Sequence, residues 1–372
     1  MAHPDVAIIG GGIIGLTSAY FLAKSGASVA VYDRGDLGKE ASWAGAGILP
    51  PGNPDRAATP IDKLRGIGSV RFPAFSAELR ALTGVENGYR HCGGMEFLTA
   101  EDAGVPQVWA AEGIAFERLT LAEARELEPL GRVDGEPYLL PGFAQVRNPW
   151  HLRALVAACL RVGVVLRPHE AVAGWLSEGR QVRGVRLESG ESVFAKACLL
   201  ASGAWSESLL KPLGCTPHVH PVRGQIALLR GPSCSRVLMF GKRYLVPRGD
   251  GLTLVGSTEE PEAGFEKRCT PEGIGGLAGF ARRVLSITDT TIETSWAGLR
   301  PASPDGLPFI GPVPGWENVF VATGHFRAGV QLSIGTAQAV TELLTGKPTC
   351  VPLEAFALDR KPGATAMSAF RS

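Results

Sequence analysis

The feature that most constrains this chain is a glycine-rich turn between two apolar runs, in DVAIIGGGIIGLTSAYFLAKSGASVAVYDRG at residues 5–35. Val6–Ile9 is typical of a strand buried on both faces, and it leads into Gly10-x-Gly12-x-x-Gly15. In that order, such glycines permit a tight turn, close approach of the backbone to a pyrophosphate, and close packing of the next helix. The helix N-terminus then faces the phosphates. The segment therefore predicts a dinucleotide-binding βαβ unit.

Asp33 follows the second predicted strand, residues 29–32, about 20 residues beyond the glycines. A carboxylate at this place accepts hydrogen bonds from a ribose diol and repels a 2′-phosphate, which disfavours NADP. A glycine-rich turn alone is weak evidence in a chain with 48 glycines. Here strand, turn, helix, second strand and acid occur in order, which favours nucleotide binding over a merely tight turn.

Length and composition narrow the class of protein. The 372 residues give room for two connected domains, each with its own core. With 45% hydrophobic residues, 20% charged residues and a net charge of +1, nothing indicates nucleic acid or an anionic membrane as partner. No apolar stretch reaches the roughly 18 residues of a membrane helix. A strand predicted from residue 6 leaves no room for a removable signal, so we expect a cytoplasmic location.

The cysteines and histidines do not suggest a metal. Seven scattered cysteines without a C-x-x-C pair predict reduced thiols rather than a disulfide framework or a zinc site. His218 and His220 form the one close histidine pair, and their proline neighbours favour a role at a strand edge. We therefore expect no metal site.

The first half of the chain beyond this unit contains a small-residue segment and several predicted helices. The sequence ASWAGAGILP at 41–50 allows backbone to lie against a ligand, with a flexible loop as the alternative. Residues 60–130 and 150–161 predict helices, and residues 162–167 predict a short buried strand.

The second half is rich in strand patterns. Residues 171–200 predict a three-stranded antiparallel meander that leads into a strand of the nucleotide sheet, and residues 218–300 predict a separate antiparallel sheet. Residues 318–325 and 329–344 predict a strand, a glycine turn and a helix at a second face of the same cofactor. No second G-x-G-x-x-G follows a strand, so a second Rossmann domain for a pyridine nucleotide is not expected.

With these segments in place, the chain resembles the D-amino-acid oxidase family of FAD enzymes, most closely its glycine oxidase branch, which is associated with thiamine biosynthesis. Besides the first motif, the resemblance rests on ASWAGAGILPP, PVRGQ at 221–225, YLVPRGDGLTLVGSTEE at 244–260, WAGLRPASPDGLPFIGP at 296–312 and VFVATGHFRAGVQLS at 319–333. It implies an α/β fold in which a Rossmann-type FAD-binding domain is interleaved with an antiparallel-sheet α+β substrate domain. The FAD-binding domain would comprise residues 1–80, 145–215 and 305–360, the substrate domain 81–144 and 216–304, and a flexible tail 361–372.

The resemblance also implies which residues hold non-covalent FAD. No cysteine lies in the 296–311 motif, which argues against covalent attachment. The glycines of the first motif would hold the pyrophosphate, Asp33 the ribose, Val172 the adenine, and the segment from Gly324 to Gly329 the flavin pyrimidine. The full expected set is Gly10, Gly12, Ile13, Ile14, Gly15, Asp33, Arg34, Ala41, Ser42, Gly45, Ala46, Gly47, Val172, Ser202, Gly203, Gly298, Arg300, His325, Phe326, Arg327, Ala328, Gly329 and Val330.

For the substrate, the resemblance implies that Arg300 and Tyr244 hold an amino-acid carboxylate, for which a guanidinium fork is the right partner. A surface ion pair is the alternative for Arg300, and a core aromatic for Tyr244. Arg327 would lie near the site entrance. His325, which could be mistaken for a catalytic base, is expected to serve the turn or to pack beside the flavin.

The implied reaction is oxidation of glycine or another small amino acid. Hydride passes from Cα to flavin N5, an imino acid forms, and O2 reoxidises the flavin to give H2O2. Glu259 stands where the branch has a pocket-lining methionine, Lys242 replaces a histidine, and Ala328 stands where asparagine is common. The two charged residues among these departures leave another small or basic D-amino acid, or an N-methyl glycine, open as substrate.

Two other functions remain open. One is a D-amino-acid or sarcosine-type oxidase or dehydrogenase with another amine or acceptor, and the other is a flavin-binding subunit without turnover. Related enzymes are often tetramers, so a homo-oligomer is expected.

Overall fold

The computed structural model describes residues 3–231, 233–287 and 289–361. Its frame is a six-stranded sheet in the order β19, β20, β13, β1, β2, β9. The strands are β19 (Phe309–Pro312), β20 (Val319–Thr323), β13 (Ala197–Leu200), β1 (Val6–Ile9), β2 (Val29–Tyr32) and β9 (Val165–Arg167). All pairs are parallel except β19 with β20, and both predicted strands of the βαβ unit lie at the centre or next to it.

The sheet is buried on both faces because its central strand is apolar at every position. Val6 and Ile8 belong to the core shared with helices α1 (Ile13–Lys24), α3 (Pro60–Thr83), α6 (Asn148–Arg161) and α9 (Gly329–Leu344). Ala7 and Ile9 belong to the core on the opposite face. Alternating side chains thus serve two cores, as the β-branched run at Val6–Ile9 predicts.

The opposite face is covered by the antiparallel meander β10 (Val172–Glu178), β11 (Gln181–Leu187) and β12 (Ser192–Phe194), together with α7 (Ser206–Leu210). The predicted meander is confirmed, and its chain passes directly into β13.

The second large element is an eight-stranded sheet in the order β18, β14, β17, β16, β15, β5, β7, β6. Its strands are β18 (Thr291–Ala302), β14 (His220–Arg230), β17 (Leu252–Gly256), β16 (Arg243–Pro247), β15 (Val237–Phe240), β5 (Gly94–Leu98), β7 (Glu136–Leu140) and β6 (Glu117–Arg118). The sheet is antiparallel apart from the β15–β5 pair, and α8 (Pro271–Leu285) packs its apolar side against it. The predicted separate sheet is therefore confirmed.

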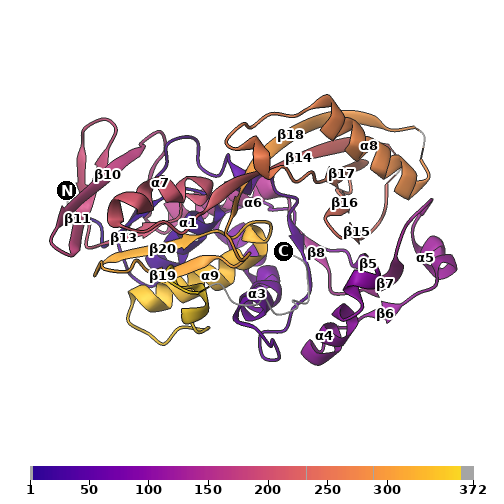
Figure 1. The fold of residues 1–372 in the computed structure, drawn as a ribbon, viewed down its shortest axis with the longest axis horizontal. Coiled ribbons are helices and arrows are strands. Elements are labelled where there is room, and N and C mark those ends of the chain that lie inside the picture. The colour runs from indigo at the N-terminus through magenta and orange to yellow at the C-terminus, as the bar shows by residue number, and fades with distance from the viewer. Residues whose placement is uncertain (1–2, 232, 288, 362–372) are drawn as a thin grey trace.

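Figure 1 shows the six-stranded sheet with α1 and α9 on the left and the eight-stranded sheet with α8 on the right. Strands β3 (Ile48–Leu49), β8 (Ala144–Gln145) and β4 (Arg90–His91) form a small sheet. The remaining helices are α2 (Ala41–Ala44), α4 (Val105–Glu112) and α5 (Leu121–Leu127), and the short 3-10 helices are η1 (Ala100–Asp102), η2 (Gly203–Trp205), η3 (Lys211–Leu213), η4 (Pro261–Ala263) and η5 (Glu354–Phe356). The strands of the two large sheets come from different expected domains, whose exact boundaries stay a prediction.

Two expectations about local structure were wrong, and a third, the helix at 150–161, is confirmed as α6 with an earlier start. Residues 60–130 are not helical throughout, because β4, β5 and β6 interrupt them and β5 pairs with both β15 and β7. The strand expected at 162–167 is the sheet edge β9, and its Val165 is 53% exposed. The helix expected from residue 150 begins at Asn148, since Pro149 suits a first turn.

Other expectations concern absences or the chain end. No helix in the described part of the chain combines the length and apolar character needed to cross a membrane. The same residues hold no cluster of three or more metal-ligating side chains, and all seven cysteines are free. The tail expected at 361–372 lies outside the described residues, apart from residue 361.

Candidate active site

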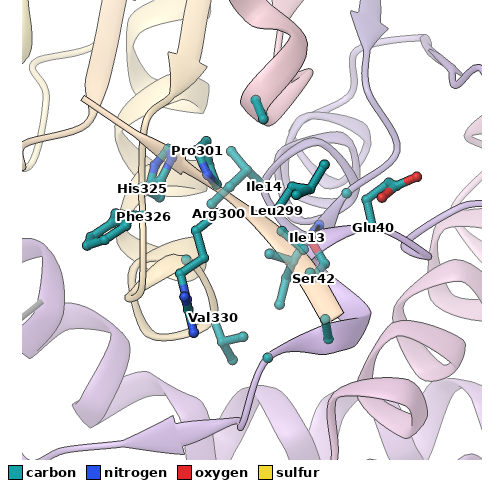
Figure 2. A pocket seen from close by; sticks show the side chains of 18 of the residues that line it. Ile13, Ile14, Glu40, Ser42, Leu299, Arg300, Pro301, His325, Phe326 and Val330 are labelled. Atoms are coloured by element: carbon teal, nitrogen blue, oxygen red, sulfur yellow. Dashed lines mark hydrogen bonds between the residues drawn. The ribbon is translucent and has the colours of Figure 1, made fainter. Parts of the chain in front are cut away.

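A cavity of about 650 Å³ lies where the two large sheets meet. Its wall includes residues that follow the carboxyl ends of β1, β2 and β13, which is where open α/β sheets bind ligands. Figure 2 shows Ile13, Ile14 and Ser42 on one side of this cavity and Arg300, His325 and Phe326 on the other. We call the part around Gly12, Asp33 and Ser42 the dinucleotide end. The part around Lys242, Tyr244, Arg300 and Arg327 is the arginine end.

The glycine-rich turn packs as its sequence predicts. Gly10 has φ of +112°, and a Cβ on Gly15 would lie 1.9 Å from the Gly10 carbonyl oxygen. Helix α1 can therefore lie directly on the turn only because residue 15 has no side chain. Gly15 is the one expected cofactor residue that does not line the cavity, in agreement with a packing role.

The N-terminus of α1 presents a positive potential to the cavity. Gly12 is the N-cap and has no side chain to cap the helix, and the first turn holds no acidic residue. The Ile13 N–H donates to Ser42 Oγ at 2.9 Å, which ties the small-residue segment to the helix start. A helix N-terminus without an acidic residue and with a glycine turn beside it favours a phosphate group.

Asp33 is held in place by backbone donors. Its Oδ2 accepts from the Gly11 N–H at 2.7 Å and its Oδ1 from the Gly35 N–H at 2.9 Å. Burial raises the pKa of this carboxyl above its ordinary value, and the two N–H groups act in the opposite direction. The free lone pairs of the carboxylate remain available for ribose hydroxyls in the cavity.

Trp205 is a site residue that the sequence did not reveal. The Arg34 guanidinium lies over its indole ring at 3.7 Å, and Arg34 also pairs with Glu40 at 3.5 Å. All three side chains line the cavity near Asp33. An aromatic residue in a short 3-10 helix carries no pattern of its own, so only the structure could show it.

The segment before α9 supplies the flavin side of the expected site. Helix α9 begins at Gly329 with no acidic residue in its first turn, so its N-terminus also favours negative charge. His325 is buried, its Nε2 lies 3.1 Å from Thr336 Oγ1, and burial lowers its pKa to about 3. Burial favours the neutral ring, which is bonded to Thr336 of the following helix α9, in agreement with a structural role rather than a general base. Phe326 holds a positive φ of 45°.

Arg300 on β18 points into the arginine end (Figure 2). Its Nη2 donates to Ser257 Oγ at 2.6 Å, and its Nη1 donates to the Thr258 carbonyl at 3.2 Å. A Cβ on Gly224 would lie 2.1 Å from Nη1, so the guanidinium rests on bare backbone of β14. Tyr244 lies similarly over Gly256, its neighbour on β17.

The described lining residues include five cationic side chains, and four of them are ion-paired. Arg34 pairs with Glu40, and Arg65 pairs with Asp62 at 3.0 Å. Lys242 and Arg327 both pair with Glu259. The partners of Arg300 are a hydroxyl and a carbonyl, so among the described residues its charge has no anionic partner and can pair with an incoming anion.

Glu259 differs from its expected place. It does not line the cavity but lies behind Lys242 and Arg327, with Oε1 2.7 Å from Lys242 Nζ and Oε2 paired with Arg327. Its negative charge is therefore already matched, so it is not placed to select a basic substrate.

Apart from Gly15, every expected site residue lines the cavity. That set is Gly10, Gly12, Ile13, Ile14, Asp33, Arg34, Ala41, Ser42, Gly45, Ala46, Gly47, Val172, Ser202, Gly203, Tyr244, Gly298, Arg300, His325, Phe326, Arg327, Ala328, Gly329 and Val330. The volume, the glycine turn at the α1 N-terminus and the fixed Asp33 carboxylate fit a dinucleotide cofactor with a small substrate beside it.

The fold and this site are those of a dinucleotide-dependent oxidoreductase. The family pattern of FAD dependent oxidoreductases matches residues 5–343, and the chain belongs to that family. Its cofactor is FAD, and it is an enzyme that moves electrons through that flavin.

Several known proteins are similar to this chain over nearly its whole length. It is 37% identical to the glycine oxidase of Pseudomonas putida, over 96% of this chain and 99% of that protein. The solved glycine oxidase of Geobacillus kaustophilus matches with a TM-score of 0.91 and 31% identity, covering 98% of this chain and all of that one. The bifunctional protein ThiO/ThiG of Nostoc is 36% identical over 91% of this chain, which spans 52% of that protein.

Proposed function

We propose that this enzyme oxidatively deaminates glycine or another small amino acid, with Arg300 binding the substrate carboxylate. The observation that carries the proposal is the charge state of the cavity wall. Among the described lining cations, Arg300 is the one whose hydrogen-bond partners are neutral. A guanidinium fork in a partly buried site is a strong and oriented partner for a carboxylate.

The arginine end explains how a small amino acid would be oriented. Arg300 fixes the carboxylate, and the Tyr244 ring, packed on Gly256, places its hydroxyl as a second donor from the neighbouring strand pair. Bound FAD would accept the two electrons of the substrate Cα–H bond as a hydride, while the amine lone pair forms the C=N bond of the imine, and would pass them on to an acceptor.

Oxygen is the proposed acceptor and H2O2 the second product, as the names of the relatives suggest. The similarity to a ThiO/ThiG protein supports a role in supplying the imine for thiamine thiazole synthesis. The cofactor is proposed to be non-covalent, which is supported by the lack of any cysteine among the described lining residues. Seven free thiols support a reducing, cytoplasmic location.

Anaerobic mixing of the purified flavoprotein with glycine tests the proposal. Glycine should bleach the flavin absorbance, and air should restore it with one H2O2 per cycle. Arg300→Ala should keep the flavin but lower kcat/KM for glycine by about 30-fold to several thousand-fold, since losing one partner of such a pair costs about 2–5 kcal/mol. Arg230→Ala is the matched control, because Arg230 lies on the neighbouring β14 but at the surface, paired with Glu293.

Other outcomes identify the other functions. Bleaching by sarcosine or a D-amino acid but not by glycine would identify another amine as the substrate, with the same site residues. Bleaching without reoxidation by air would indicate a dehydrogenase with another acceptor. Failure of every amine to bleach the flavin would indicate a subunit without turnover. Gel filtration of the same sample tests the expected homo-oligomer.

A further inference from the structure

One tetrapeptide, Ser257-Thr258-Glu259-Glu260, contacts four cations, of which Lys242, Arg300 and Arg327 line the arginine end. It follows β17, and its residues bond cationic side chains from four different places in the chain. Ser257 and Thr258 bond Arg300 from β18, and Glu260 bonds Arg223 from β14. Glu259 bonds Lys242 and Arg327. Ser257 and Thr258 thus leave Arg300 without an anionic partner. Glu259 and Glu260 neutralise the other three cations.

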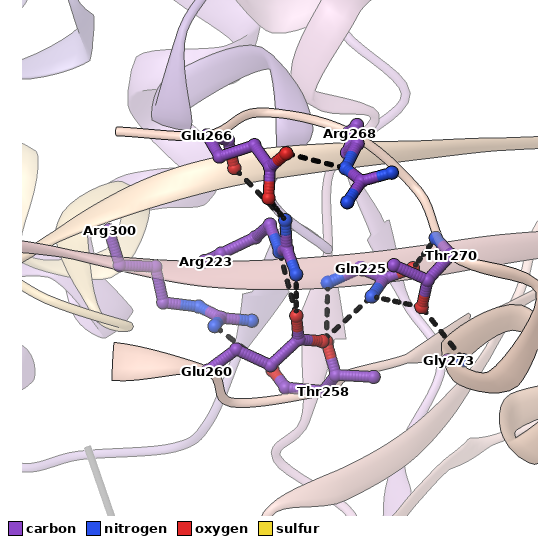
Figure 3. Close-up of polar contacts among 9 residues, drawn as sticks. All are labelled: Arg223, Gln225, Thr258, Glu260, Glu266, Arg268, Thr270, Gly273 and Arg300. Atoms are coloured by element: carbon purple, nitrogen blue, oxygen red, sulfur yellow. Dashed lines mark hydrogen bonds and ion pairs between the residues drawn. The ribbon is translucent and has the colours of Figure 1, made fainter. Parts of the chain in front are cut away.

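Two residues of the tetrapeptide, Thr258 and Glu260, are held by side chains and backbone of β14 (Figure 3). Gln225 is fully buried; its backbone N–H donates to Thr258 Oγ1 at 2.8 Å and its Nε2 donates to Glu260 Oε1 at 2.7 Å. Arg223 Nε donates to Glu260 Oε2 at 2.7 Å, and Arg223 also bonds Glu266. Glu259 therefore starts from a fixed backbone, which limits where its carboxylate can reach.

The two partners of Glu259 are not equivalent. The Lys242 side chain is 65% exposed, so water screens its charge. The Arg327 side chain is only 16% exposed, and burial lowers its pKa from the ordinary value. Glu259 matters mainly as the counter-ion of Arg327, a cation that faces the same cavity as Arg300.

Resting on the proposed function, we propose that Glu259 sets the charge of the substrate that this enzyme accepts. By neutralising Arg327, it leaves Arg300 as the cation of the arginine end whose partners are neutral. The accepted class is then amino acids with one carboxylate and no second anionic group. A second carboxylate would meet the matched Glu259–Arg327 ion pair instead of a free cation.

Removing the charge of Glu259 should open a second anion site. In Glu259→Gln, Arg327 keeps its charge in a partly desolvated place without a counter-ion, and a second carboxylate would supply one. Reduction kinetics with N-methylglycine and N-carboxymethylglycine compare one and two carboxylates on otherwise similar amines. Acetate and malonate make the same comparison without turnover, through the shift that they cause in the flavin spectrum.

The experiment measures the ratio of malonate to acetate affinity in the flavin-loaded proteins. We expect this ratio to rise about tenfold or more in Glu259→Gln, with a parallel rise in the relative kcat/KM for N-carboxymethylglycine. Glu262→Gln, at an exposed position three residues further on, should leave the ratio unchanged. The double variant Glu259→Gln/Arg327→Gln should return it toward the original value, because the freed cation is gone.

The outcomes separate this inference from the proposed function. An unchanged ratio in a flavin-loaded Glu259→Gln protein that still binds acetate overturns the inference and leaves the role of Arg300 intact. A raised ratio that persists in the double variant also overturns it, because Arg327 would not be the group responsible. If acetate binds the original protein no better than it binds Arg300→Ala, the proposed function fails and this inference fails with it.

Discussion

The two ends of the cavity differ in what faces the ligand. At the dinucleotide end, the groups are mainly backbone N–H groups and glycines from the first 50 residues, with Asp33 held by two backbone donors. At the arginine end, they are long side chains, of which Lys242, Arg300 and Arg327 are held by bonds to one tetrapeptide and Tyr244 packs on Gly256. The shape of the dinucleotide end depends on the absence of side chains, whereas the arginine end depends on how its charges are paired.

The largest effect is expected at the dinucleotide end, from Gly15→Ala. The new Cβ would lie 1.9 Å from the Gly10 carbonyl oxygen, so α1 must move off the turn, at a cost of about 1–3 kcal/mol. We expect purified protein without flavin, measured by its visible absorbance. Gly279→Ala is the control, because Gly279 is also within a helix but has open space around it. Full flavin content in Gly15→Ala would show that the packing of α1 on the turn is not needed.

A smaller effect is expected at the arginine end, from Gly224→Ala. The Cβ would lie 2.1 Å from Arg300 Nη1, and the guanidinium must shift away from β14. Flavin should remain bound while kcat/KM for glycine falls about 10²-fold, as for a misplaced orienting group. Gly174→Ala, another strand glycine with nothing within 4 Å, should change neither quantity. Loss of flavin together with activity in Gly224→Ala would mean that the two ends are not independent.

The smallest effect is a change of thermal stability with pH, caused by the buried carboxyl of Glu112. This group lies near the ion pair of Asp62 with Arg65, and Arg65 also lines the cavity. Glu112 at the end of α4 is 1% exposed, and burial raises its pKa from 4.5 to about 7. Between pH 4.5 and pH 7 the folded protein keeps a proton that the unfolded chain releases. The contribution of this proton to the free energy of unfolding is complete below pH 4.5 and is lost as the pH rises through 7.

We therefore expect the Tm to fall by a few degrees between pH 5 and pH 8, beyond any change in Glu112→Gln. Calorimetry of both proteins at the two pH values makes the comparison. Equal pH dependence in the two proteins would show that Glu112 is ionised without cost in the folded state.

Sequence reasoning worked best where chemistry follows from neighbours along the chain. The turn at Gly10, Gly12 and Gly15 and the carboxylate of Asp33 need only a strand, a turn and a helix in order. The local rules fix that geometry, and the structure has it. Arg300 and Tyr244, by contrast, came from resemblance, because nothing in Leu299-Arg300-Pro301 distinguishes a ligand-binding arginine from a surface one.

What could not be predicted depends on contacts between distant segments. The contact of the Arg300 guanidinium with the backbone of Gly224 follows from the register of β14 on β18. The ion pair of Glu259 with Arg327 joins the segment after β17 to the segment after β20, which belong to different sheets. The edge position of β9 likewise depends on strand order rather than on its own apolar residues. Local sequence patterns carry no information about such contacts between distant segments.

The order of the six-stranded sheet has a consequence for how the protein forms. Strand β1 pairs with β13, and β13 pairs with β20, so neighbours in the sheet are separated by more than a hundred residues along the chain. Strands this far apart in the chain pair slowly, because the entropy of loop closure is lost before the stabilising contacts form. During synthesis the first glycine turn emerges early, but the sheet beneath it stays incomplete until β20 has left the ribosome. The cofactor can therefore be captured in its full site only after nearly all of the chain has been made.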